Sequence, residues 1–283
     1  MKKLTALLMG TAMVLSLAAC GGSASSAASS EAASSEAASS EAASSEAVST
    51  EEAASADAAE LTTVTAGKLT MSTNAAFPPY EMTTDSGDFE GIDIEVAGAI
   101  AEKLGLELQI DDMDFDAALL SVQQGKADIV MAGVTVTDDR KAVMDFSDSY
   151  ATGIQSIIVP NDSEIASPDD LAGKKIGTQR GTTGYIYCSD DFGDDNVVAY
   201  DDGLTAVQAL NNGQVDAVVI DNAPAQEFIA ANPGLAILDT SYAEEDYAIG
   251  MAKGSSLEDA VNAALKELKA DGTLQSIVDK YIT

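Results

Sequence analysis

Arg140 and Asp221 are the two charged residues whose positions suggest chemistry. The chain has only two arginines, and Arg140 lies in AGVTVTDDRK (132–141), after small and β-branched residues typical of a strand end. A guanidinium presents a planar fork that can hold a carboxylate through two hydrogen bonds. Asp221 ends the apolar run AVVI, where a carboxylate needs a partner or a cleft.

Both residues also have a purely structural interpretation. Arg140 could be an exposed helix residue that pairs with Asp138 or Asp139. Asp221 could be the N-cap of a helix expected over 223–231, a position that aspartate favours. The residues alone leave these alternatives open, and an aspartate could serve as cap and ligand group together.

A third polar motif, GTTG (181–184), follows the strand-like KKIGT (174–178). Backbone N–H groups at the start of a helix attract anions. Taken by itself, a turn flanked by two glycines is the simpler interpretation.

The composition excludes several classes of protein. There is no histidine, no CxxC pair, and no GxGxxG or GxxxxGK[ST] motif, which argues against Ser-His-Asp catalysis, most zinc sites and common nucleotide cofactors. We expect no cofactor. The 47 acidic residues outnumber the 14 basic ones, so nucleic acid is a poor partner.

Strand and helix patterns alternate along most of the chain, which predicts an α/β fold with largely parallel sheets. A Pro after Ser167 predicts a short helix there, and Ser255 with Glu258 is spaced as a capping box. Strands are expected at 68–73, 106–110, 127–133, 174–178, 196–200 and 215–221, and helices at 94–104, 116–124, 203–212, 256–270 and after Gly272.

Two segments, 119–133 and 207–221, align without a gap. Each contains the end of an amphipathic helix, a glycine, an aspartate and a buried strand. The match indicates two lobes of one topology. Ligands in such sheets bind outside the carboxyl ends of the strands, so Gly133 and Asp221 would face one cleft.

The N-terminal part indicates export and membrane attachment. Residues 1–19 are typical of a signal peptide, and Leu-Ala-Ala before Cys20 resembles the bacterial lipobox, in which the cysteine becomes lipidated. Residues 20–61 repeat Ala, Ser and Glu, which predicts a disordered linker. The expected location is the extracytoplasmic face of a cell membrane, of a Gram-positive type, held by a lipid anchor. Cys188 is then left as a small, partly buried hydrophobic residue.

The folded part resembles the extracytoplasmic solute-binding proteins of polar amino acid ABC transporters, family 3, with the type II periplasmic-binding-protein fold. The resemblance covers about residues 66 to 282. It rests on AAFPPYE (75–81), GIDIEVAGAIAEKLG (91–105), the long stretch at 113–150, and GTTG with VDAVVIDN (215–222). It implies one lobe over 62–154 plus 243–283 and a second over 155–242, joined by crossovers near 151–158 and 243–250.

The resemblance also implies roles for individual residues. Arg140, with Thr182 and Thr183, would hold the carboxylate of a free amino acid, and Asp221 its ammonium group. The remaining candidate ligand contacts are the Gly133 carbonyl and the Thr135 hydroxyl for the ammonium, Ala132 beside them, Phe77 and Phe115 in loops on either face of the ligand side chain, and Asn74, Glu81 and Gln179 for specificity.

The implied function is transport and not catalysis. A monomeric protein would capture an amino acid and deliver it to a permease and an ATPase on separate chains. Asn74 is a neutral amide, which favours an uncharged polar ligand such as glutamine, although Glu81 could serve a cation. The alternatives are a prephenate or arogenate dehydratase-like enzyme with Glu81 as its acid, and a sensory co-receptor for the same ligand.

Overall fold

The computed structural model describes residues 61–282. The predicted signal peptide and Cys20 lie outside the described residues, as does all of the predicted linker except residue 61. Across 61–282, every helix is too short or too polar to span a membrane.

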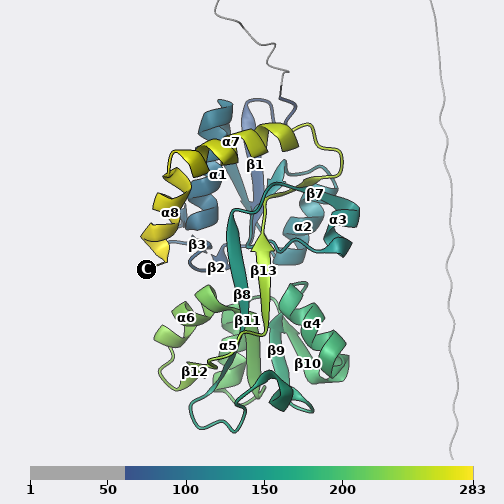
Figure 1. The fold of residues 1–283 in the computed structure, drawn as a ribbon, viewed down its shortest axis with the longest axis vertical. Helices are drawn as coiled ribbons and strands as arrows, with labels where there is room; N and C mark the ends of the chain where they lie inside the picture. The colour runs from purple at the N-terminus through teal and green to yellow at the C-terminus, as the bar shows by residue number, and fades with distance from the viewer. Residues whose placement is uncertain (1–60, 283) are drawn as a thin grey trace, which may run out of the picture. The chain divides into compact units, whose positions relative to one another are not determined.

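The first lobe is built on a five-stranded sheet, flanked by α1 (Ile92–Leu104), α2 (Phe115–Gln123), α7 (Glu258–Ala270) and α8 (Thr273–Tyr281). β1 pairs in parallel with β5 and β6, whereas β14 pairs antiparallel with β6 and β7. α7 and α8 both pack on α1 (Figure 1). The strand order is β5 (Glu107–Asp112), β1 (Lys68–Thr73), β6 (Ile129–Val130), β14 (Gly250–Ala252) and β7 (Met144–Phe146).

The second lobe has a six-stranded sheet with α4 (Thr183–Phe192), α5 (Gly203–Asn211) and α6 (Asn222–Ala230) around it (Figure 1). β9 pairs in parallel with β10 and β11, and β8 runs antiparallel to β11, β12 and β13. The order is β10 (Val197–Tyr200), β9 (Ile176–Gln179), β11 (Ala217–Asp221), β8 (Ala151–Pro160) and β12 (Leu235–Ile237), with β13 (Ala243–Tyr247) on β8.

Two strands, β8 and β13, run between the lobes as an antiparallel pair (Figure 1). Their register sets Gln155 opposite Ala243 and Ala151 opposite Tyr247. Thr135, from the first lobe, forms a single β-bridge with Tyr247. One strand in each sheet, β14 or β8, runs opposite to the others, so both sheets are mainly parallel in strand direction, as predicted. The predicted lobe boundaries fall within or beside these two strands and remain a prediction.

The internal repeat has the same backbone form in both lobes. The C-cap residues of α2 and α5, Gln124 and Asn212, have φ angles of −88° and −87°, and the glycines that follow have φ of +65° and +66°. The aspartate after each glycine accepts a backbone N–H beside the neighbouring parallel strand: Asp128 from Thr70 and Asp216 from Lys175, at 2.7 and 2.8 Å.

A small antiparallel sheet covers one side of the first lobe. It consists of β2 (Ala76–Phe77), β3 (Glu81–Thr83) and β4 (Phe89–Glu90). It carries Phe77, which was expected in a loop, and Glu81. Three short helices complete the described chain: α3 (Asp138–Val143), η1 (Pro168–Leu171) and η2 (Asp194–Asn196).

Several local predictions need correction. The strand predicted over 127–133 is only Ile129–Val130, because the chain then leaves the sheet and turns at Gly133, whose φ is +54°. Ser255 does not cap α7. Its hydroxyl accepts from Leu257 N–H at 3.2 Å, Leu257 is the N-cap, and the helix begins at Glu258. The short helix predicted after Ser167 is present, as a single 3₁₀ turn capped by Ser167.

Cys188 is fully buried in the apolar core of the second lobe, as its interpretation as a small hydrophobic residue requires. Burial raises the pKa of its thiol to about 12, so it is held in the unreactive thiol form.

Candidate functional site

A buried space lies where the two sheets face each other, and residues from both lobes line it. Its volume is about 430 Å³, part of which is open to solvent. All eleven residues predicted to contact a ligand line this space: Asn74, Phe77, Phe115, Ala132, Gly133, Thr135, Arg140, Gln179, Thr182, Thr183 and Asp221.

The ends of parallel strands deliver the polar groups. Asn74 follows β1, Gly133 lies three residues beyond β6, Gln179 is the last residue of β9, and Asp221 is the last residue of β11. Parallel strands end at one edge of a sheet, so these four residues gather at the two facing edges. The topology therefore accounts for a single site assembled from positions about 150 residues apart.

Arg140 is buried, with only 8% of its surface exposed. It is the third residue of α3, where the Thr137 side chain caps the helix and accepts the Arg140 N–H at 3.2 Å. The guanidinium donates to the Thr135 carbonyl at 2.8 Å and to the Gly181 carbonyl of the second lobe at 3.2 Å. Asp138 is exposed, so the interpretation of Arg140 as a surface residue paired with it is wrong.

Two phenylalanines form apolar walls of the space. The Phe115 ring lies 5.4 Å from the Arg140 guanidinium carbon, a cation–π distance, and Phe115 is the first residue of α2 instead of a loop residue. Phe77 stacks on Tyr80 with ring centroids 5.8 Å apart. A Cβ on Gly133 would come within 2.9 Å of the Phe77 ring, so glycine is required there for space as well as for its positive φ.

Asp221 combines the two roles considered for it, since it is a helix cap and a residue of the cavity wall. One carboxylate oxygen accepts from Ala223 N–H at 2.9 Å and caps α6, and the other accepts from Ile154 N–H on β8 at 2.8 Å. Burial raises the pKa of Asp221 to about 6, although these two backbone donors lower it. A buried carboxylate of this kind is stabilised by a cation placed beside it.

The N-terminus of α4 lies at the cavity, and its N-cap Thr182 and first residue Thr183 line the cavity wall. The Thr182 hydroxyl donates to the Gln179 carbonyl at 2.8 Å and accepts from Tyr185 N–H, so it is occupied as a helix cap. Thr183 is 3% exposed, and its hydroxyl lies 3.4 Å from that of Thr135 across the two lobes. What this helix start can offer a ligand is its backbone N–H groups and the Thr183 hydroxyl.

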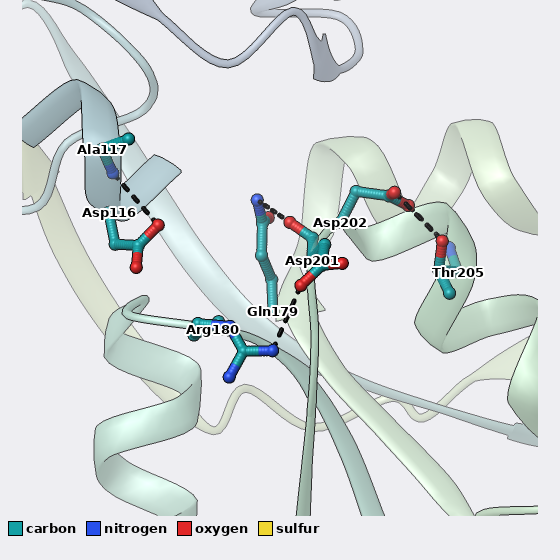
Figure 2. A network of polar contacts seen from close by, with 7 residues as sticks. All are labelled: Asp116, Ala117, Gln179, Arg180, Asp201, Asp202 and Thr205. Carbon is teal, nitrogen blue, oxygen red and sulfur yellow. Dashed lines mark hydrogen bonds and ion pairs between the residues drawn. The ribbon is translucent and has the colours of Figure 1, made fainter. Parts of the chain in front are cut away.

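Asn74 and Gln179 join the lobes at another point of the wall. Gln179 Nε2 donates to Asn74 Oδ1 at 2.8 Å, and Asn74 Nδ2 donates to the Met113 carbonyl at 3.0 Å. Gln179 also bonds to the Asp201 carbonyl, as Figure 2 shows. Its neighbour Arg180 turns to the Asp201 carboxylate, 3.1 Å away, with half of its side chain exposed, so Arg180 is a surface residue (Figure 2).

Glu81 adds a buried acid to the cavity wall. It is fully buried, and no group among residues 61–282 donates a hydrogen bond to either of its oxygens. Burial, followed by repulsion from Asp93, raises its pKa well above the usual range. Asp93 itself accepts from Gly133 N–H at 3.0 Å and from the Tyr150 hydroxyl at 2.7 Å, which fixes the turn that carries the Gly133 carbonyl. No metal-ligand cluster of three or more side chains occurs within the described chain.

Sequence reasoning did not single out Gln155, Val219, Ile220 and Tyr247, which also line the space. Gln155 and Tyr247 belong to the two strands that cross between the lobes. Those strands were expected to serve only as a hinge, and their alternation of inward and outward side chains is the signal that could have identified both residues.

Comparison with known proteins identifies the class. Residues 69–283 match the family model of the bacterial extracellular solute-binding proteins, family 3. The chain resembles the L-cystine-binding protein TcyJ of Escherichia coli (strain K12), with 32% identity over an alignment that covers 76% of this chain and 82% of that protein.

Solved structures agree with this match. The arginine-, lysine-, histidine-binding protein ArtJ from Geobacillus stearothermophilus has a TM-score of 0.73 at 33% identity, covering 76% of this chain and 95% of ArtJ. An ancestral arginine-binding protein bound to glutamine has a TM-score of 0.73 at 40% identity, covering 76% of this chain and 98% of that chain. An ancestral arginine-binding protein bound to arginine has the same TM-score and identity.

The fold is therefore the two-lobed, type II periplasmic-binding-protein fold, as the resemblance implied. The chain belongs to the bacterial extracellular solute-binding proteins, family 3. Its relatives are amino acid-binding proteins of ABC transporters and not enzymes.

Proposed function

We propose that this protein captures a free polar amino acid outside the membrane and delivers it to the permease of an ABC importer. One observation carries the proposal. A buried cation of the first lobe, Arg140, and a buried carboxylate of the second, Asp221, line the same enclosed space. That pairing complements a zwitterion, because each charged end of the ligand meets an opposite charge in a site shielded from water.

In this proposal, the ligand carboxylate replaces the two carbonyl oxygens as the hydrogen-bond acceptor of the Arg140 guanidinium. Its two terminal nitrogens now donate to carbonyl oxygens, and a carboxylate accepts the same two bonds more strongly. The start of α4, with Thr183, would complete the carboxylate site from the second lobe. Asp221, the Gly133 carbonyl and Thr135 would receive the ammonium group.

Closure of the lobes is the proposed mechanism of capture. Gln179 with Asn74, and Thr135 with Thr183, are contacts between lobes that can form only when the lobes are together. A ligand that touches both lobes in the closed form adds its binding energy to these contacts and shifts the population towards closure.

The neutral amide of Asn74 favours an uncharged polar ligand such as glutamine, and glutamine is bound by the ancestral relative. The Asn74 amide is already hydrogen-bonded to Met113 and Gln179, so it would contribute polarity at the wall without adding charge.

Arginine is the second candidate ligand, favoured by Glu81. A guanidinium placed against this buried acid would supply the hydrogen bonds that its oxygens lack. ArtJ and the ancestral protein are named for arginine. Calorimetry at pH 7.5 in two buffers of different ionisation enthalpy separates the candidates. Arginine should release a proton from Glu81 on binding, whereas glutamine should not.

We also propose the remaining features of the delivery system. Cys20 would carry the lipid that holds the protein on the outer face of the membrane, and the 20–61 linker would let the folded part reach the permease. The protein would act as a monomer, with lobes at 62–154 plus 243–283 and at 155–242. Mass spectrometry of the membrane-extracted protein tests the lipid on Cys20.

The function is tested by thermal unfolding with each amino acid in turn, cystine included. A tight ligand at about a hundred times its Kd should stabilise the protein by roughly 2.7 kcal/mol. Arg140→Ala should abolish this shift while the ligand-free protein still unfolds cooperatively. Arg180→Ala, which removes the other arginine, should keep the shift. A normal shift in Arg140→Ala, or no shift with any amino acid in the wild type, would contradict the proposal.

A further inference from the structure

Glu245 is a buried carboxylate directly behind the wall of the site. It is 6% exposed and lies on β13, where its neighbours Glu244 and Asp246 face solvent. Burying a carboxylate is costly unless donors and an opposite charge compensate for it. An apolar residue would fill this buried strand position without the cost of burying a charge. The groups that contact Glu245 therefore indicate its role.

Donors converge on one of its oxygens from different parts of the molecule. Gln155 Nε2, on β8, donates to Glu245 Oε2 at 2.9 Å, and the Thr135 hydroxyl of the first lobe donates to the same oxygen at 3.1 Å. The Thr135 hydroxyl is in turn 3.4 Å from that of Thr183 in the second lobe. These side chains form a continuous path from the crossover strands to both faces of the cavity.

The charge of Glu245 also acts on its surroundings. Burial lowers the pKa of Arg140, and the negative charge of Glu245 acts in the opposite direction. Tyr187, on α4, also lies close to Glu245: burial and then Glu245 raise the pKa of this tyrosine to about 12. Glu245 thus balances the cation of the site without lining the cavity itself.

The hydrogen-bond directions have a chemical consequence. A hydroxyl has one hydrogen to donate and two lone pairs, whereas a carboxylate only accepts. Because Thr135 gives its hydrogen to Glu245, the side that faces the cavity and Thr183 carries lone pairs only. An ammonium group can donate to such an oxygen, but another acceptor meets repulsion.

We infer that Glu245 is a positioning residue of the binding site: by taking the Thr135 hydrogen, it makes that hydroxyl an acceptor for the ligand ammonium group. The inference rests on the proposed function, since it assumes a free amino acid in the cavity. It assigns to a residue of the crossover strand a part in selecting the ligand's charged end.

The test compares two single-charge changes on one strand. Glu245→Gln keeps the shape but removes the charge and lets the new amide donate to Thr135. Glu244→Gln makes the same change on the exposed face. With L-arginine and L-glutamine as probes in calorimetry, Glu245→Gln should weaken binding of whichever amino acid the wild type binds by about tenfold or more. Glu244→Gln should stay within about twofold of the wild type.

A double-mutant cycle separates positioning from general destabilisation. Thr135→Val removes the hydroxyl, so adding Glu245→Gln to it should weaken binding by no more than about twofold further. If Glu245→Gln does not fold, Glu245→Asp replaces it in the same double-mutant cycle, because the shorter side chain withdraws the carboxylate from Thr135 by one methylene. Independent effects that multiply, or wild-type affinity in the Glu245 variant, would overturn the inference and leave the proposed function standing. A wild type that no amino acid stabilises in the thermal-unfolding screen would overturn both.

Discussion

At the scale of single residues, burial decides the chemistry of the site. If Arg140 and Asp221 were exposed on the surface, water would screen their charges and they would interact only weakly. Inside the cavity they are 8% and 2% exposed, and each is held by backbone partners in one orientation. An enclosed charge interacts several times more strongly than one in water, so two buried groups can provide most of the affinity for a zwitterion.

Affinity for the ligand should fall in acid because of Asp221. Its pKa of about 6 means that it takes up a proton below that pH, and an ammonium group must then displace the proton in order to bind. We expect Kd, measured by calorimetry from pH 7.5 to 4.5, to rise by up to about tenfold per pH unit below about 6.

The control for this pH dependence is Asp221→Asn. It should bind weakly at pH 7.5 and lose the pH dependence assigned to Asp221. A wild-type Kd that stays constant down to pH 4.5 would show that Asp221 does not receive the ammonium group.

At the scale of elements, the two crossover strands do more than connect the lobes. β8 and β13 supply Gln155, Tyr247 and Glu245 to the site or its support, and they pack closely on each other. Gly153 shows how closely: a Cβ there would lie 2.4 Å from Cζ of Tyr247. The strand pair therefore has little room for larger side chains on its inner face.

Gly153→Ala should destabilise the protein by about 1–3 kcal/mol, because the added methyl overlaps the Tyr247 ring and the strands must move apart. Urea unfolding followed by circular dichroism measures the change. Gly98→Ala is the matched control: this glycine lies within α1 with open space around it, and alanine should stabilise the helix by about 0.5–1 kcal/mol. Equal stability of the two variants would contradict the tight packing of β8 on β13.

At the scale of the whole molecule, low pH should stabilise the ligand-free fold but weaken ligand binding. The chain carries a formal charge of −33, and burial raises the pKa of both Asp93 and Asp221 from 3.8 to about 6. Ionising these two groups costs the folded protein free energy. The ligand-free fold binds more protons than the unfolded chain in this window, and it should therefore become more stable as protons are added.

We expect the free energy of unfolding of the ligand-free protein to rise as the pH falls from about 6 to 4, by up to about 3 kcal/mol for each of the two groups. Urea titrations at several pH values measure this. Saturating ligand should reduce the effect, since its ammonium group stabilises ionised Asp221. A ligand-free stability that falls steadily from pH 7 to 4 would contradict the raised pKa values.

Much of the fold could be predicted because its signals are local. Helices such as 94–104 and strands such as 68–73 follow from apolar spacing, and the repeated helix–glycine–aspartate–strand unit predicts two similar lobes. Predictions failed where a local rule met tertiary contacts. In place of the capping box predicted at Ser255, the chain forms a turn that buries Leu257. The strand predicted over 127–133 ends early, at the turn where Gly133 packs beside Phe77.

The sequence by itself determined that Gly133 and Asp221 meet at the site, since strand ends of a repeated α/β unit lie at the sheet edges. Arg140 was identified by its place in the family motif. Only the tertiary structure decided how these groups are supported and charged. Glu81 and Glu245 have no local pattern to mark them, because a carboxylate's environment depends on the segments that bury it. The donors to Glu245 come from positions 90 and 110 residues away, and such pairings arise only when the crossover strands bring the lobes together.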